Sequence, residues 1–267
     1  MATDVSNELD RTDDLGPLGG AVEPRRLLLG LVGLAGFVGL WWIGSTLQPA
    51  YILPSPLAVA ETVQSEIASG AMQTALLDSV VHWLPGTVVG TTLGIATGVA
   101  LGWSRILEET LTPVVRILRP VPPLALIGFA IAWFGIGHAG AAFIIAIGAF
   151  WINFYAAYGG VEGVSDDLLD VARSLGVKRQ TGLIRKVVLP ASLPEIMTGV
   201  RTGIGRCWML VVAAEIFGAP GIGRQIFRSA NSLQVDRVIA YILVLSVMFL
   251  LVDTAFRLLQ RRVLVWR

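Results

Sequence analysis

The stretch VPPLALIGFAIAWFGIGHAGAAFIIAIGAFWINFYAAYGGV, residues 121–161, contains no Asp, Glu, Lys or Arg. An α-helix rises about 1.5 Å per residue, so about 20 apolar residues cross the roughly 30 Å of hydrocarbon in a bilayer. The stretch is about twice that length, and Gly135, Gly137 and Gly140 stand near its middle. Glycines are typical of turns. We therefore expect two membrane-spanning helices joined by a short hairpin at residues 135–140.

The composition of the whole chain favours the same class. Its 267 residues are 54 % hydrophobic and 15 % charged, with a mean hydropathy of +0.71. An average soluble domain has about 25 % charged residues, so too few charges remain here to cover a soluble globule. The formal net charge of +1 argues against a nucleic-acid partner. One cysteine and two histidines argue against a disulfide framework and a metal centre. We expect an all-α polytopic membrane protein without a cofactor.

Other charge-poor stretches supply further spans, and we expect six in all. Pro120, Pro122 and Pro123 remove backbone donors, so the third span should be bent. The expected spans cover residues 27–47, 80–103, 113–135, 139–160, 194–217 and 238–257. Lys and Arg stay on the cytoplasmic side of a membrane. Residues 48–78 have none, so we expect that segment outside and both termini in the cytoplasm.

The expected organisation has four parts. Residues 1–26 indicate a disordered acidic cytoplasmic tail, because six acidic side chains and several glycines leave little apolar surface to bury. A cleaved signal peptide is the rival interpretation, since Arg25 and Arg26 precede an apolar run. The other parts are a first transmembrane helix with an external segment (27–72), a five-span transmembrane domain (73–260) and a basic cytoplasmic tail (261–267).

The polar loop at residues 162–195 has a helical pattern of its own. Ser165 can cap a helix whose first turn holds acidic residues, which the helix dipole favours. Apolar side chains then recur on one face, at Val164, Leu168, Val171, Ala172 and Leu175. Gly176 is a typical helix stop, and Ser192 with Glu195 has the spacing of a capping box for the fifth span. A helix this short needs something to pack on, either a partner or the membrane surface and neighbouring spans.

Asp170-Val171-Ala172, then Gly176, and later Val188-Leu189-Pro190 form a pattern similar to E-A-A-x3-G-x9-I-x-L-P. That pattern is the cytoplasmic signature of binding-protein-dependent ABC transporter permeases. Asp and Val replace its Glu and first Ala, and Leu-Pro arrives one residue late, so we infer a one-residue insertion after Gly176 and assign Val187 to the Ile position. Residues 53–56, 119–137 and 205–226 also resemble the nitrate, sulfonate and taurine branch of this family.

The resemblance implies one half of a type I importer. Its partners would be a second copy of this chain, cytoplasmic ATP-binding subunits and an external solute-binding protein. Its solute would be a small anion such as nitrate or a sulfonate such as taurine, although the same branch includes carriers for vitamin precursors. Residues 168–176 with the following turn would form a coupling helix seated in the ATP-binding subunit, with the glycine allowing close approach. The implied coupling residues are Leu168, Asp170, Val171, Ala172, Arg173, Leu175, Gly176, Leu189 and Pro190. The chain has no G-x-x-x-x-G-K-[ST] loop, so we do not expect it to hydrolyse ATP or to be an enzyme.

Two polar residues in the expected spans are candidates for the substrate pathway, since intramembrane polar groups often have functional roles. Glu215 lies close to the expected outer boundary and is either an outer gate or a contact with the docked binding protein, or else a hydrated carboxylate paired with Arg224 or Arg228. Asn153 lines a pore or makes a hydrogen bond between helices, and His82 has the same two interpretations.

Charged residues elsewhere in the spans favour structural roles. Asp253 stands one helical turn before Arg257 and is expected to pair with it. Arg201 and Arg206 either line an inner vestibule or reach toward lipid headgroups.

Two other functions compete with the importer interpretation. An ion-coupled secondary carrier needs polar groups near mid-membrane on broken helices. An intramembrane enzyme needs a cluster of acidic, His or Cys side chains at one depth. The sequence shows no convincing example of either arrangement.

Overall fold

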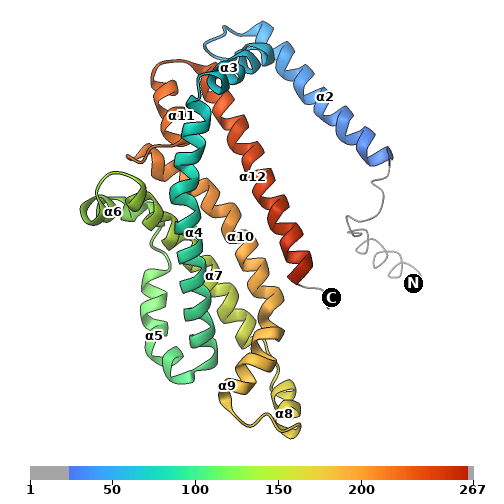
Figure 1. Ribbon diagram of the computed structural model, residues 1–267, viewed down its shortest axis with the longest axis vertical. Helices are drawn as coiled ribbons and strands as arrows, with labels where there is room; N and C mark the ends of the chain where they lie inside the picture. The colour runs from blue at the N-terminus through green and yellow to red at the C-terminus, as the bar shows by residue number, and fades with distance from the viewer. Residues whose placement is uncertain (1–23, 264–267) are drawn as a thin grey trace, which may run out of the picture. The chain divides into compact units, whose positions relative to one another are not determined.

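The computed structural model describes residues 24–263, which form helices and no strand, and this confirms the expected all-α class. The chain divides after Ala58 into two units, and Figure 1 shows the helices of each. The elements are α2 (Pro24–Leu47), α3 (Pro56–Ala68), α4 (Ala71–Trp103), α5 (Arg105–Leu118), the 3-10 helix η1 (Pro123–Leu126), α6 (Ile127–Phe134), α7 (His138–Glu162), α8 (Asp166–Ser174), α9 (Gln180–Leu183), the π-helix η2 (Ile184–Val188), α10 (Leu189–Ile216), α11 (Ile222–Asn231) and α12 (Val235–Val263).

The first unit contains the predicted first span. Within α2, residues 28–47 are long and apolar enough to cross a membrane. The chain then folds back so that the indole nitrogen of Trp41 donates a hydrogen bond to the carbonyl of Pro54, at 3.0 Å. The helix begins at Pro24, so residues 24–26 of the predicted tail are helical, and residues 1–23 lie outside the described residues. At the other end α12 reaches Val263, and only residues 264–267 of the predicted basic tail lie outside.

The second unit is built on close contact between α4 and α7. A row of glycines, one on each turn of α4, faces α7, at Gly86, Gly90, Gly94 and Gly98. A Cβ added at Gly90 would lie 2.1 Å from the carbonyl oxygen of Ala146. Small residues of this kind let helix backbones approach closely, which is how membrane helices gain packing energy. The glycines therefore fix how α4 and α7 meet.

The helix α10 completes this core by packing against α7. The rings of Trp83 on α4 and Trp208 on α10 meet edge to face, with centroids 5.2 Å apart. Ile145 of α7, with Cys207 and Val211 of α10, joins the two indoles in one buried cluster. Aromatic rings favour this edge-to-face geometry because of their quadrupoles. The three helices thus form one packed body.

The expected bend in the third span is confirmed. Residues 105–118 and 123–134 are two helices related by 83°, with the Pro122–Pro123 pair at the break. The expected hairpin is confirmed as well, since α6 ends at Phe134 and α7 begins at His138, with Gly135 and Gly137 at positive φ between them.

The number of spans is judged from the length and hydropathy of the described helices. Among the described residues, four helices are long and apolar enough to cross a membrane, or five if the bent pair counts as one span. The predicted fifth span corresponds to α10, which falls outside this set and carries Glu195, Arg201, Arg206 and Glu215. The count of six remains a prediction.

The predicted start of the fifth span is wrong. The helix α10 begins at Leu189, directly after the π-helix η2, with Pro190 in its first turn. Ser192 is already inside the helix, and its buried hydroxyl donates to the carbonyl of Val188, at 2.8 Å. It therefore does not form the capping box predicted with Glu195.

Candidate functional site

The loop singled out in the sequence contains α8, a nine-residue helix close to the predicted bounds. Ser165 occupies the N-cap position without a side-chain hydrogen bond, and two acidic residues stand in the first turn. At the other end, the amide of Gly176 donates to the carbonyl of Arg173 and the amide of Val177 donates to that of Ala172, each at 3.0 Å. This pair of bonds is a Schellman motif. The helix end is thus set by its own backbone.

The apolar side chains of α8 divide into two groups. Leu169 and Ala172 are buried in the chain itself, and Leu169 packs in a cluster with Val161 and Val188. Leu168, Val171 and Leu175 keep 43 %, 56 % and 81 % of their surface exposed. The sequence analysis placed Ala172 on the outward face and overlooked Leu169. The available signal was the apolar residue at 169, because residues three apart on a helix share a face and Leu169 therefore lies beside Ala172.

The polar members of the predicted coupling set lie beside this exposed apolar group. Arg173 donates to the carboxylate of Asp170, at 2.7 Å, and both side chains are largely exposed. Gly176 has a φ of +95°, and a Cβ added there would meet nothing within 4 Å. Within this chain the glycine is therefore required by its backbone conformation and not by crowding.

Leu189 and Pro190 follow a short stretch of unusual helix geometry. The segment just before them, Ile184–Val188, is a π-helix, in which the amide of Leu189 bonds to the carbonyl of Ile184. A π turn holds one residue more than an α turn. Leu189 is half-buried and Pro190 is exposed at the start of α10, and the one-residue insertion after Gly176 stays a prediction.

Asn153, predicted for the pathway, is completely buried between α7 and α4. Its amide nitrogen donates to the hydroxyl of Thr91 on α4, at 3.1 Å, and to the carbonyl of Ala149, at 2.8 Å. The interhelical hydrogen bond considered in the sequence analysis is therefore present.

Glu215 is also completely buried, which rules out the hydrated carboxylate paired with Arg224 or Arg228. Its carboxylate lies 3.0 Å from Nε2 of His82 and accepts a hydrogen bond from the amide of Gly223. Arg224 instead donates to the carbonyl of Gly218, at 3.0 Å. The error came from treating residue 215 as interfacial by its distance along the helix, although the loop after α10 folds back over it.

The predicted pair of Asp253 and Arg257 is confirmed, with Nε of Arg257 2.7 Å from the carboxylate. Arg201 of α10 also reaches Asp253, at 3.2 Å, so this arginine joins α10 to α12. Neither a vestibule role nor a lipid-facing role is needed to account for it.

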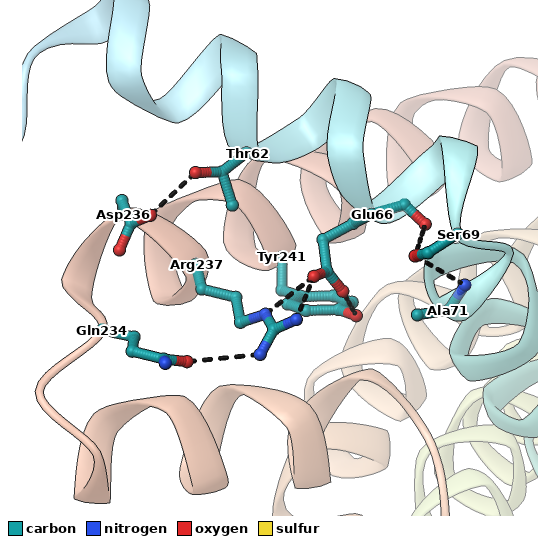
Figure 2. A network of polar contacts seen from close by, with 8 residues as sticks. All are labelled: Thr62, Glu66, Ser69, Ala71, Gln234, Asp236, Arg237 and Tyr241. Atoms are coloured by element: carbon teal, nitrogen blue, oxygen red, sulfur yellow. Dashed lines mark hydrogen bonds and ion pairs between the residues drawn. The ribbon is translucent and has the colours of Figure 1, made fainter.

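A second polar cluster, which the sequence analysis missed, joins α3 to α12 (Figure 2). Glu66 is buried; it accepts hydrogen bonds from Nε of Arg237, at 2.8 Å, and from the hydroxyl of Tyr241, at 2.6 Å. Thr62 donates to Asp236, at 2.7 Å. These partners are more than 170 residues apart in the sequence, so no local pattern could indicate them. In the described part of the chain, no group of acidic, His or Cys side chains could hold a metal ion.

Comparison with known proteins identifies the family. Residues 90–265 match the family described as the binding-protein-dependent transport system inner membrane component. A protein of Bacillus subtilis named as an aliphatic sulfonates transport permease, SsuC, is 34 % identical over 241 residues, covering 89 % of this chain and 87 % of that protein. The taurine transport system permease protein TauC of Escherichia coli is 32 % identical over 250 residues, which cover 91 % of this chain and 90 % of that protein.

The chain belongs to this family of ABC transporter permeases.

A solved relative supports the fold of the permease. A chain from inward-facing structures of the MetNI methionine ABC transporter superposes with a TM-score of 0.66 at 19 % identity, covering 74 % of this chain and 98 % of that one. At this identity the likeness concerns the fold alone.

Family membership decides between the competing functions. The permease is a membrane subunit of an ATP-driven importer, an inner membrane component that works with an ATP-binding subunit and a solute-binding protein. It is not an enzyme, because ATP hydrolysis belongs to the separate subunit. An ion-coupled carrier and an intramembrane enzyme are thereby excluded.

Proposed function

We propose that α8 is the coupling helix of this permease and docks on the cytoplasmic ATP-binding subunit through Leu168, Val171 and Leu175. The observation that carries the proposal is the exposure of these three apolar side chains on a helix whose adjoining side, at Leu169 and Ala172, is already buried within the chain. Burying a leucine or valine side chain contributes about 1.5–3 kcal/mol. Burying the parts of these three side chains that are still exposed would therefore contribute to docking.

In this arrangement the other predicted coupling residues surround the apolar contact. The exposed pair of Asp170 and Arg173 makes polar contacts at the rim, and Gly176 allows the partner to come close because no side chain occupies the space beside it. Leu189 and Pro190 begin α10 directly after the loop. A displacement of α8 would therefore be transmitted to α10, which is 28 residues long. Nucleotide-driven movement of the partner would then tilt α10.

The proposal includes the assembly and orientation implied by the sequence. Two copies of the permease pair in the membrane, both termini lie in the cytoplasm, and residues 48–78 face the outside. The lack of Lys and Arg in that segment supports this orientation. Asn153 and Glu215 remain pathway candidates only if helix movement exposes them, because both are buried in this conformation.

We further propose a small anion as the solute, delivered by the external binding protein. The names of the relatives support this class: they include permeases for aliphatic sulfonates, taurine and bicarbonate. Uptake of labelled taurine, an alkanesulfonate, nitrate and bicarbonate by cells containing the complete transporter would identify the solute. Uptake of none of them would contradict the proposed class.

The docking proposal is tested by replacing Leu175 with glutamate. A charge in the apolar contact should remove the ATP-binding subunit from the purified complex and abolish ATP-driven uptake, while the permease still reaches the membrane. Ile106→Glu is the matched control, because Ile106 is 78 % exposed and lies in the first turn of α5, where glutamate is favoured. Retention of the ATP-binding subunit by Leu175→Glu would contradict the assignment of α8.

A further inference from the structure

Two arginines stand where the third expected span breaks. Arg116 lies in the last turn of α5, and Arg119 directly follows that helix, before the chain turns by 83° into η1 and α6 (Figure 1). Both fall inside the expected span 113–135. A charged side chain within a span is unfavourable, and it commonly marks the pathway of a solute or an ion.

The guanidinium of Arg119 lies over an aromatic ring of α7. Its Cζ is 4.5 Å from the centroid of Tyr155. Trp151 and Phe154 hold that ring in place, with centroids 6.3 Å and 5.1 Å from it. The face of the ring attracts the positive charge, but it offers no oxygen to the five N–H donors of the guanidinium. The contact therefore positions the cation and leaves its hydrogen bonds to another group.

No carboxylate neutralises either arginine. In the described part of the chain neither of them forms an ion pair, whereas Arg201 and Arg257 share Asp253. Arg116 and Arg119 stand one helical turn apart, where like charges repel. The negative end of the helix dipole favours them, but it amounts to roughly half an elementary charge against two full ones. An anion bound between the two arginines would offset the remaining repulsion.

The break itself is not covered by this chain. Every residue of the described helices α5 and η1 keeps part of its surface exposed, and both arginines are exposed. A break in a span is tolerated where it is packed in protein or lines a water-filled cavity. Two uncompensated cations favour the cavity.

We propose that Arg116 and Arg119 form a binding site for a small oxyanion at the break of the third span, which the solute occupies on its way through the permease. A guanidinium presents paired N–H donors in one plane, and these match two oxygens of a single acid group. A sulfonate, a carboxylate and nitrate all offer such a pair. The site therefore takes the small anions proposed as solutes and disfavours cations.

The test is the rate at which a cysteine beside Arg119 reacts with charged thiol reagents. Tyr155→Cys is made in the complete transporter in nanodiscs and labelled with sulfonatoethyl methanethiosulfonate, itself an alkanesulfonate, or with its trimethylammonioethyl counterpart. Each rate is divided by that of the same reagent with a small thiol in solution, and the native Cys207 is fully buried. The anionic reagent should then react about tenfold faster than the cationic one, and excess ethanesulfonate should slow it. Val115→Cys, on α5 itself, is a second reporter and should show the same preference.

Two variants make the result specific. Arg119→Gln added to Tyr155→Cys should remove both the anionic preference and the effect of ethanesulfonate. Tyr158→Cys lies one turn further along α7, where the native hydroxyl contacts Glu108 at 2.7 Å, so it should favour the cationic reagent.

Three results would overturn the site: equal rates at both reporters, no reaction at either, or a preference that survives Arg119→Gln. A guanidinium bound to lipid phosphate would leave labelling unaffected by ethanesulfonate, and that result would overturn it as well.

The site rests on the proposed function only for the class of solute, and the labelling needs no uptake. Native uptake of none of the four anions, with the labelling preference intact, would contradict the proposed solute and not the site. Where the native transporter carries one of them, Arg119→Gln should lower its uptake about tenfold, and Arg119→Lys less, because lysine keeps the charge but loses the paired donors. Unchanged uptake in Arg119→Gln would contradict passage through this site while the proposed solute stands.

Discussion

Replacing Gly176 tests two reasons for a glycine at the end of α8. Its φ of +95° is a conformation that costs a residue with a Cβ about 1–2 kcal/mol. The two Schellman hydrogen bonds contribute about 1 kcal/mol each and oppose that cost. The two effects nearly balance in Gly176→Ala. Between about one half and five sixths of the molecules should keep this helix end, so uptake should fall by about twofold at most.

The second reason, close approach of the ATP-binding subunit, needs a different substitution. Asparagine tolerates positive φ better than alanine, so Gly176→Asn should keep α8 ordered in hydrogen exchange. Its side chain would nevertheless fill the space that is open in this chain and available to the partner. Uptake should then fall below that of Gly176→Ala, and Gly176→Trp should abolish it.

The assay is ATP-driven uptake in proteoliposomes, read beside hydrogen exchange of residues 166–177. Gly128→Ala is the matched control, because Gly128 also has open space around its Cβ position but no positive φ. Uptake at the native rate in Gly176→Asn would refute the close approach of the ATP-binding subunit to Gly176. The backbone conformation would then be the remaining reason for a glycine at this position. Native uptake in all three variants would refute both reasons.

Three further substitutions probe the packing. Gly90→Ala should push α4 from α7 and lower the free energy of unfolding by about 1–3 kcal/mol in a thermal assay, whereas Gly30→Ala on α2, which has open space, should not. Glu66→Gln weakens the contact with Arg237 and should speed hydrogen exchange of α3, and unchanged exchange would contradict the role given to that cluster. Asp253→Asn removes the charge shared by two arginines and should lower the melting temperature modestly; an increase would contradict that pairing.

The sequence predicted the features that depend on local pattern. Charge-free runs located α2, α4 and α7, prolines located the bend before α6, and glycines located the hairpin before His138. The nine-residue helix α8 was found from its periodicity and its terminal Gly176. These features could be predicted because hydrophobicity, helix stops and missing backbone donors act on neighbouring residues.

The features that the sequence did not predict depend on contacts between distant segments. Glu215 was assigned to a wet interface because position along a helix says nothing of a loop that folds back over it. Glu66 and Arg237 are 171 residues apart, and their pairing needs the fold to be known. Ala172 was placed on the outer face of α8, because a helical stripe does not reveal which edge the chain itself covers.

The account depends most on the docking of α8, and site-directed disulfide formation tests it most directly. Leu175→Cys, paired with single cysteines in the ATP-binding subunit, should form a disulfide in membranes, with a yield that changes when ATP is added. Leu169→Cys should form none, because Leu169 faces Val161 and Val188 within the chain. The native Cys207 is fully buried and will not compete. A disulfide at position 169 but not at 175, or none at either, would contradict the central claim.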